Sequence, residues 1–350
     1  MGIVRHGRDV TSATPSRRAL LRGALGLLAL PHAGMLAGCT TALTSSNARL
    51  DAPAIAVRPT LLVATTRRPV NEGHASPWYG TERASGLNLA RAKLVPPDEG
   101  RFSFASIGLG DWSLAGVDQV KRIGELIPSE LEQRDLLIYV HGFNQTFETA
   151  TLDAARLSDG IRFRGESMVF SWPSKAKLFD YAYDRESAMW SRDALERVLS
   201  LLMASPGVGR IHIVAHSVGT MLSMEALRQI YARHGLAVTD RFGAVIFAAP
   251  DIDMDVFASS LERMRPLVPN ITVITSTNDR ALAVSGWIAG GMTRVGAAEK
   301  AQLEGLGLRV IDASASGFGF INHDLFLSNN DIRRVIREAV DAVAPNPRQG

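Results

Sequence analysis

Residues 215–219 read Ala-His-Ser-Val-Gly and place a serine between small residues. The preceding stretch, 210–214, is alternately apolar and predicts a buried strand, and a helical pattern follows. A serine on such a strand-to-helix turn projects its hydroxyl above a sheet, where it can attack an acyl group. The first position of this motif is usually glycine, and Ala215 is still small. Serine is also a favoured first residue of a helix, and Ser-x-Gly is common by chance, so the motif alone is a weak signal that also fits a helix cap.

A serine hydroxyl is a weak nucleophile until a base removes its proton. In α/β-hydrolases the chain order of the catalytic residues is serine, acid, histidine. Only His234 and His323 follow Ser217 in the sequence. His234 precedes Gly235 in a pattern typical of a helix end. His323 lies in a loop after the last predicted strand and is therefore the predicted base.

The acid that orients the histidine is expected in a loop after a strand. Asp279 follows the predicted strand 271–276, which is the penultimate one, and is the favoured acid. Asp251 follows the strand before it and is the alternative. Asp253 and Asp255 are expected to cap the next helix.

Acyl transfer also needs two backbone N–H groups that stabilise the developing oxyanion. The residue after the serine, Val218, is expected to supply one of them, and Gly219 keeps the turn open. The second is expected from Phe143, in a loop where Gly142 lets the backbone approach the substrate. His141 precedes the serine in the chain, so we expect it to hydrogen-bond within its own loop.

The elements that position these residues alternate between strand and helix from residue 135 onward. The predicted strands are 60–67, about 87–95, 101–109, 135–143, 167–174, 210–217, 242–249, 271–276 and 308–314. The predicted helices include 146–158, a helix capped by Asp184 that contains Leu195 to Leu202, 220–232, and a final helix after Asn330. This order predicts a mostly parallel sheet with helices on both faces. Ligands of such sheets bind at the carboxyl ends of the strands, where all the candidate residues fall.

Residues 1–38 have the composition of a secretory signal, with a basic start and an apolar run from Leu20 to Leu30. Leu-Ala-Gly before Cys39 resembles a lipoprotein cleavage site, which implies cleavage before Cys39 and a lipid on its sulfur. "SRRALLR" also resembles a twin-arginine export signal. Residues 39–58 are small and polar and predict a lipidated tether. Residues 59–345 are then expected to form one domain.

The charge of the chain changes at the same boundary. The whole chain has a net charge of +3, and the first 38 residues, with five arginines and one aspartate, carry +4. The remainder is therefore close to neutral, at −1. A nucleic-acid-binding face would show clustered Lys and Arg, so no nucleic-acid partner is expected. Cys39 is the only cysteine, which leaves neither a disulfide nor a cysteine metal site.

Several motifs together resemble the bacterial branch of the α/β-hydrolases called domain of unknown function 900. They are "LLIYVHGFN", "FSWPS", "YDRESAMWSRDALE", "IHIVAHSVGT", "AAPDID" and "DRAL". The resemblance extends from about Thr60 to Val343 and implies an α/β-hydrolase fold with serine-hydrolase activity, without indicating a substrate. Members typically carry Met after the serine, where this chain has Val218. That position acts through its backbone, so we expect a mild effect.

The leading hypothesis is a serine hydrolase that cleaves an ester or thioester through an acyl-enzyme on Ser217, with a small acyl compound as substrate. A non-catalytic binding or scaffolding lipoprotein on the same fold is one alternative, and an acyltransferase with the same triad is another. No metal-binding, phosphate-binding or dinucleotide motif is present, so neither a metal nor a cofactor is expected. The expected location is the bacterial cell envelope on the periplasmic face, and Thr40 after the lipidated cysteine favours the outer membrane.

Overall fold

The computed structural model describes residues 60–71, 75–97, 112–127, 133–177, 180–277, 279, 282, 285, 293–314, 327 and 329–342. All of them belong to one unit of the chain, Ala52–Gly350. The predicted signal, Cys39, the strand at 101–109 and His323 lie outside the described residues. The division of the chain into signal, tether and one domain therefore stays a prediction.

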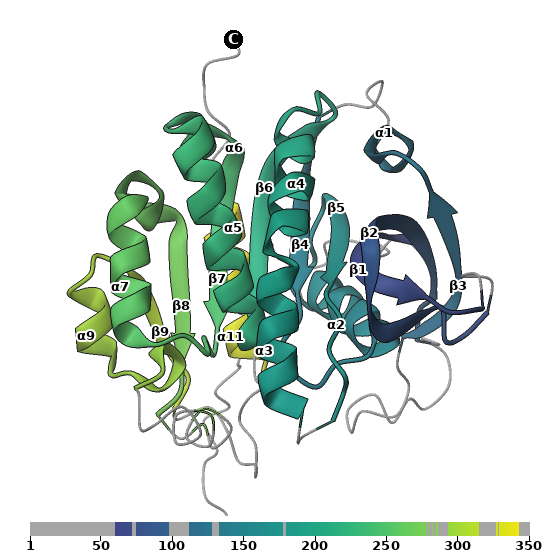
Figure 1. The fold of residues 1–350 in the computed structure, drawn as a ribbon. Coiled ribbons are helices and arrows are strands. Elements are labelled where there is room, and N and C mark those ends of the chain that lie inside the picture. Colours follow the sequence, from purple (N-terminus) through teal and green to yellow (C-terminus); the bar gives the residue numbers. More distant parts are fainter. Residues whose placement is uncertain are drawn as a thin grey trace, which may run out of the picture. The chain divides into compact units, whose positions relative to one another are not determined.

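The strands of the described residues form one nine-stranded sheet (Figure 1). They are β1 (Thr60–Pro69), β2 (Tyr79–Val95), β3 (Ser113–Val120), β4 (Arg134–Val140), β5 (Glu166–Ser171), β6 (Val208–His216), β7 (Phe242–Ala248), β8 (Ile271–Thr275) and β9 (Arg309–Asp312). Their order in the sheet is β3-β2-β1-β5-β4-β6-β7-β8-β9. The strand pairs from β1–β5 to β8–β9 are all parallel, and only the β1–β2 and β2–β3 pairs are antiparallel. The mostly parallel sheet of the α/β-hydrolase fold is thus present.

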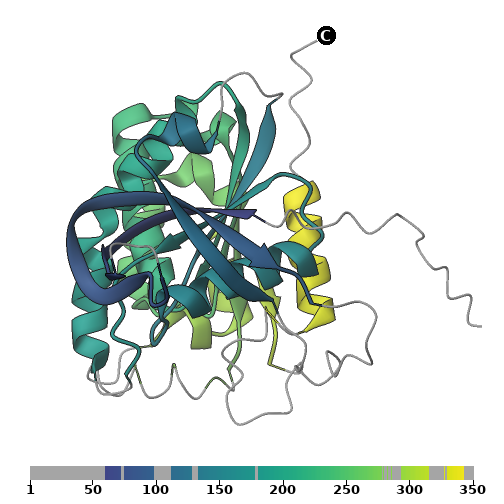
Figure 2. The ribbon, with the colours of Figure 1, turned by 90° about the vertical axis from the view of Figure 1, so that its right-hand side faces the viewer.

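The helices are α1 (Ile123–Leu126), α2 (Phe147–Gly160), α3 (Tyr181–Trp190), α4 (Arg192–Met203), α5 (Val218–His234), α6 (Ala237–Arg241), α7 (Met254–Arg263), α9 (Lys300–Glu304) and α11 (Asn330–Asp341), with short 3₁₀ turns η4 (Arg265–Asn270) and η5 (Val295–Ala297). Viewed from the side, α11, in yellow, lies across the sheet from the teal and green helices (Figure 2). Helices therefore cover both faces, as predicted.

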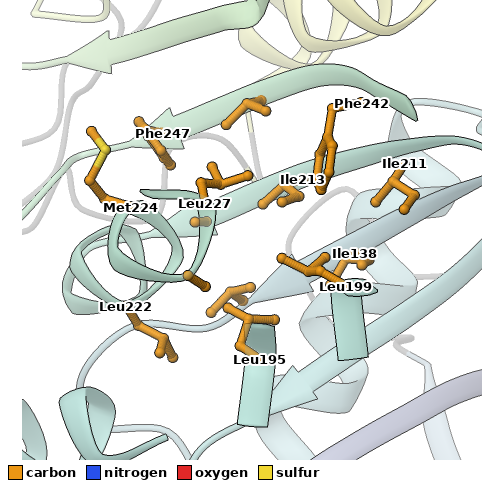
Figure 3. Close-up of a cluster of buried hydrophobic side chains, with 14 of the residues drawn as sticks. Ile138, Leu195, Leu199, Ile211, Ile213, Leu222, Met224, Leu227, Phe242 and Phe247 are labelled. Atoms are coloured by element: carbon orange, nitrogen blue, oxygen red, sulfur yellow. The ribbon is translucent and has the colours of Figure 1, made fainter. Parts of the chain in front are cut away.

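Each face of the sheet has its own apolar core. On one face, α4, α5 and α7 pack on alternate residues of β4, β6 and β7. Figure 3 shows part of this core, with Leu195 and Leu199 of α4 and Leu222 and Leu227 of α5 lying against Ile138 and Ile213 of the sheet. On the other face, α2 and α11 pack on the remaining residues. Strands buried on both faces read as continuous apolar runs, which is why the sequence located them.

Three local predictions differ from the structure. β2 begins at Tyr79, well before the predicted strand at about 87–95, and β3 was not predicted. Both strands carry polar and exposed residues, since they lie at the antiparallel edge of the sheet and are not buried on both faces. The predicted helix capped by Asp184 is two helices, α3 and α4, and Asp184 lies buried within the first turn of α3.

The ends of two other helices agree with the sequence. α5 ends at His234 and is followed by Gly235, whose φ of 57° is a conformation that glycine adopts without strain. Asp253 caps α7 by accepting hydrogen bonds from the N–H groups of Asp255 and Val256. Among the described residues, no helix has the length and apolar character that a membrane span requires.

Candidate active site

Ser217 occupies the sharp turn between β6 and α5. Its φ of 51° and ψ of −122° are unusual for a residue other than glycine, and its side chain makes no capping hydrogen bond to the helix. A strained serine at this place in the fold is the geometry of a nucleophile elbow. The helix-cap interpretation predicts a side-chain bond that the structure does not contain, so the hydroxyl is not used to begin α5.

Hydrogen bonds from three sides hold the strained backbone of Ser217. Its N–H donates to the carbonyl of Ala248 at the end of β7, over 3.0 Å. Its own carbonyl accepts from the N–H of Asp251 at 3.3 Å and from the N–H and hydroxyl of Thr220 at 3.0 and 2.5 Å. Because its neighbours fix both polar groups, the turn is rigid before any substrate arrives.

Two glycines let the elbow and the loop after β4 meet closely. A Cβ on Gly142 would lie 2.8 Å from Nδ1 of His216 and 2.9 Å from Cβ of Ser217. A Cβ on Gly219 would lie 2.3 Å from the carbonyl oxygen of His141. Real Cβ atoms do not approach other atoms so closely, so both positions require glycine. Gly142 lies against the serine itself, a closer role than the approach to substrate that the sequence predicted.

The loop after β4 carries the predicted oxyanion donor and is fixed at several points. Asn144 has a φ of 62°, and its backbone hydrogen-bonds to the carboxylate of Asp184. The N–H of Gln145 donates to the hydroxyl of Ser174 at 3.2 Å. In the part of the chain that the structure describes, the N–H groups of Phe143 and Val218 hydrogen-bond to no other residue. Both are thus available to an oxyanion.

His141 is fully buried and fixes this loop to β5. Its Nε2 accepts from the N–H of Trp172 at 3.1 Å, so its Nδ1 carries the proton and donates to the carbonyl of Gly142 at 2.8 Å. The imidazole also stacks on the indole of Trp172, with ring centroids 4.7 Å apart. Burial, and then the nearby Arg67 cation, lower the pKa of His141 well below its usual value. His141 is therefore neutral and, as predicted, bonds within its loop.

Arg67, at the end of β1, is a central support of the site that sequence reasoning missed. Its side chain is fully buried and donates to the carbonyls of Gly80, Gln145 and Ser174 at 2.7–3.1 Å and to the hydroxyl of Ser171 at 2.8 Å. Burial lowers the pKa of Arg67 to about 9, so the guanidinium stays charged at neutral pH. Arg67 therefore joins the loops after β4 and β5.

A buried carboxylate, Asp184, completes this support from α3. It accepts from the hydroxyl of Ser174 and from the N–H of Lys175, the latter at 2.8 Å. Burial raises the pKa of Asp184 above its usual value, with the hydrogen bonds acting in the opposite direction. The charges of Asp184 and Arg67 attract each other electrostatically across Ser174. The motif "YDRES" carried no sign of this role, because its aspartate lies where a helix cap is expected.

The two candidate acids have different surroundings. Asp279 is buried just after β8, and its Oδ1 accepts from the N–H of Leu282 at 3.1 Å. Asp251 is buried after β7, where Tyr181 and Ser285 donate to it at 2.6 and 2.8 Å and Arg294 lies 3.1 Å away. Both oxygens of Asp251 thus accept hydrogen bonds, from Tyr181 and Ser285, and the choice between the two acids stays a prediction.

Strained backbone conformations recur just after the carboxyl ends of the strands, where the candidate residues lie. Asn144, Ala176, Ser217 and Ala249 have φ values of 46–62°, and they follow β4, β5, β6 and β7 respectively. Strain that persists at one location generally marks a functional site, since the surrounding structure must hold it in place. His323 and Cys39 lie outside the described residues. Among the described ones, Gly142 of the loop after β4 and Asp251 contact Ser217, and Asp279 follows β8.

Other places in the fold offer less for catalysis. A pocket of about 370 Å³ lies between α7, η4 and the turn after α9, beside the starts of β8 and β9. None of the candidate residues lines it. Within the described ranges, no group of three or more His, Cys, Asp or Glu is placed to hold a metal ion.

Comparison with known proteins gives distant likenesses and one family. A protein of Nostoc sp. strain PCC 7120, the uncharacterized protein alr1448, is 36% identical over 61 residues, which span 17% of this chain and 16% of that protein. An esterase from Pyrobaculum calidifontis is 13% identical and covers 82% of this chain and 87% of its own, with a TM-score of 0.38. An uncharacterized protein from Bacillus cereus ATCC 10987 is 13% identical over 61% of this chain and 60% of its own, with a TM-score of 0.40.

These structural likenesses are too distant to inform the site. The family match is broader, because residues 118–339 match the model of the family described as "Alpha/beta hydrolase of unknown function (DUF900)". This range is more than half of the chain and extends from the end of β3 to α11. The chain therefore belongs to this family of α/β hydrolases.

Proposed function

We propose that the protein is a serine hydrolase that cleaves carboxylic esters or thioesters. His323 removes the proton of the Ser217 hydroxyl as its oxygen attacks the acyl carbonyl, and Asp279 holds the imidazole. The N–H groups of Phe143 and Val218 stabilise the oxyanion. The tetrahedral intermediate expels the alcohol or thiol, which takes the proton from His323. Water, activated by the same histidine, then releases the acid and restores the serine.

The backbone of Ser217 is the observation that carries this proposal. A φ of 51° on a non-glycine residue between β6 and α5 is held by neighbours and is not used to cap the helix. The N–H groups of Phe143 and Val218 hydrogen-bond to no other residue that the structure describes. They support acyl chemistry over simple binding, because a binding site does not require an oxyanion hole. The buried carboxylate of Asp279, in the loop after β8, also supports the proposal, because it follows a strand as the acid of a triad is expected to.

A fluorophosphonate probe tests the activated serine directly, since it reacts only with a serine whose proton a base removes. Intact mass of the purified protein should show one adduct, and Ser217→Ala should show none. Ser223→Ala, another buried serine of α5, is the matched control and should keep the adduct. Turnover of phenyl acetate should fall by roughly 10⁶ in Ser217→Ala. An adduct that survives in Ser217→Ala contradicts the proposal.

We also propose that the mature protein is a lipoprotein of the cell envelope, carried by the lipid on Cys39. The support is the signal-like composition of residues 1–38 and the small residues before the cysteine. In cells, Cys39→Ser should prevent lipidation and shift the protein out of the membrane fraction. Incorporation of labelled palmitate into the native chain and not into the variant measures this. Equal incorporation in both contradicts the assignment.

A further inference from the structure

One buried carboxylate beside the proposed nucleophile lies between two arginines. Nε of Arg294 is 3.1 Å from Oδ1 of Asp251, and both side chains are almost inaccessible, at 3% and 2% exposure. NH1 of Arg185, on α3, is 3.9 Å from the same oxygen. The three side chains together carry a net charge of +1.

Arg185 is the arginine with the longer contact to this carboxylate, because its NH1 lies 3.9 Å from Oδ1 of Asp251 and Nε of Arg294 lies 3.1 Å from it. The oxygens of Asp251 already accept hydrogen bonds from Tyr181 at 2.6 Å and from Ser285 at 2.8 Å, and Oδ1 also forms an ion pair with Arg294. Arg185 itself donates to neutral groups, namely the hydroxyl of Tyr181 at 3.2 Å, the sulfur of Met221 at 3.2 Å and the carbonyl of Asp251 at 3.5 Å. Its side chain is 29% exposed, so a ligand from solvent can reach it.

The position of Arg185 relates it to the acyl site. Two residues that Arg185 contacts lie next to the turn of Ser217. Asp251 donates its N–H to the carbonyl of Ser217, and Met221 lies one helical turn after that serine in α5. The ring of Tyr181 packs edge-on against Phe143, with centroids 5.5 Å apart. Arg185 thus contacts Asp251, which hydrogen-bonds to the proposed nucleophile, and Tyr181, which packs on the proposed oxyanion donor.

We propose that Arg185 binds an oxyanion of the substrate, a carboxylate or phosphate, so that the enzyme prefers esters with a negatively charged acyl or alcohol part. This inference rests on the proposed function and adds the substrate class. A guanidinium can make two parallel hydrogen bonds to a carboxylate or phosphate, and such bonds are stronger than those it makes to a hydroxyl or sulfur. Asp251, paired with the buried Arg294, accepts a hydrogen bond from the hydroxyl of Tyr181 at 2.6 Å. Tyr181 is therefore fixed beside Arg185 before an anion binds.

The first experiment measures binding without turnover. The probe is 4-acetoxybenzoate, whose neutral counterpart of similar shape is 4-acetoxybenzamide, and the protein is Ser217→Ala. Calorimetry should give tighter binding for the anion, and adding Arg185→Gln should weaken it by about tenfold. Arg185→Lys should recover part of the loss. Adding Arg228→Gln instead, at an arginine of α5 that pairs with Glu225, should leave the affinity for the anion unchanged. Equal binding of the two probes, no binding of either, or no effect of Arg185→Gln overturns the inference.

The second experiment measures preference during turnover and locates the anion. With the serine intact, kcat/KM is compared for 4-acetoxybenzoate and 4-acetoxybenzamide, and for monophenyl adipate and phenyl hexanoate. The first pair places the charge in the alcohol part and the second in the acyl part. The anion-to-neutral ratio should exceed one in at least one pair and fall about tenfold in Arg185→Gln. If neutral esters are cleaved with a Ser217 requirement but neither ratio depends on Arg185, the inference is wrong and the proposed function stands. If the anion binds through Arg185 while no ester is cleaved and no fluorophosphonate adduct forms, the proposed function fails and the anion site stands.

Discussion

A Cβ placed on Gly142 would lie 2.9 Å from the Cβ of Ser217, so the loop after β4 rests directly on the proposed nucleophile. The proposed oxyanion donor Phe143 is the next residue in that loop. The distance between the proposed nucleophile and the proposed donor is therefore set by a contact that only glycine permits.

Gly142→Ala should lower activity more than stability. The added methyl group must displace the loop or the serine, and loss of one oxyanion donor typically costs about 10²–10³ in kcat. Overpacking should lower the free energy of unfolding by about 1–3 kcal/mol. Ester turnover and urea unfolding measure the two effects. Gly86→Ala, where no atom lies within 4 Å of the new carbon, is the control and should leave turnover at the wild-type level.

Replacing each candidate acid by asparagine should affect a different property, namely turnover for Asp279 and stability for Asp251. Asp279→Asn should reduce kcat by about 10⁴, as loss of the carboxylate of a triad leaves the wrong tautomer of the histidine, with little change in stability. Asp251→Asn should lower the free energy of unfolding by about 3–5 kcal/mol, since Arg294 would stay buried without its counter-charge. If Asp251→Asn instead lost activity while its stability and fold were unchanged, the acid would be Asp251.

Arg67 should be essential to the stability of the site, in contrast to its neighbour Arg68. Arg67→Met leaves the carbonyls of Gln145 and Ser174 without their donor, and each buried unsatisfied group costs about 1–3 kcal/mol. Arg68 is 63% exposed and pairs with Glu82, so Arg68→Met should cost no more than about 1 kcal/mol. Urea unfolding of both variants measures the difference. Equal losses would show that Arg67 does not hold the two loops.

The neutral state of His141 predicts how stability depends on pH. Its pKa is far below 6.5 in the folded protein, so the unfolded chain binds a proton below pH 6.5 that the folded protein does not. The free energy of unfolding should therefore fall as pH falls from 6.5 to 5.5, by about 1 kcal/mol from this residue. His141→Asn should reduce the slope by that amount. Urea unfolding at pH 6.5 and pH 5.5 measures the slope, and an unchanged slope in His141→Asn would contradict the prediction.

The sequence alone determined the parts of this protein that depend on local pattern. Buried parallel strands read as apolar runs, so β4, β6, β7 and β8 were predicted close to their observed places. The serine at the end of β6 and the glycines beside it were found because a sharp turn restricts which residues fit. These features involve residues near one another in the chain, and their constraints are visible there.

Tertiary structure alone decided which polar side chains are buried and what they contact. Nothing in "TTRRP" distinguishes Arg67, which is fully buried, from Arg68, which is exposed. Likewise, Asp251 and Asp279 both follow strands, and only the packing of Tyr181, Ser285 and Arg294 around Asp251 separates them. The partners of Asp251 are 34–70 residues away from it in the chain, so they come together only when the sheet assembles. Long-range hydrogen bonds and charge pairs of this kind leave no periodic signal in a sequence.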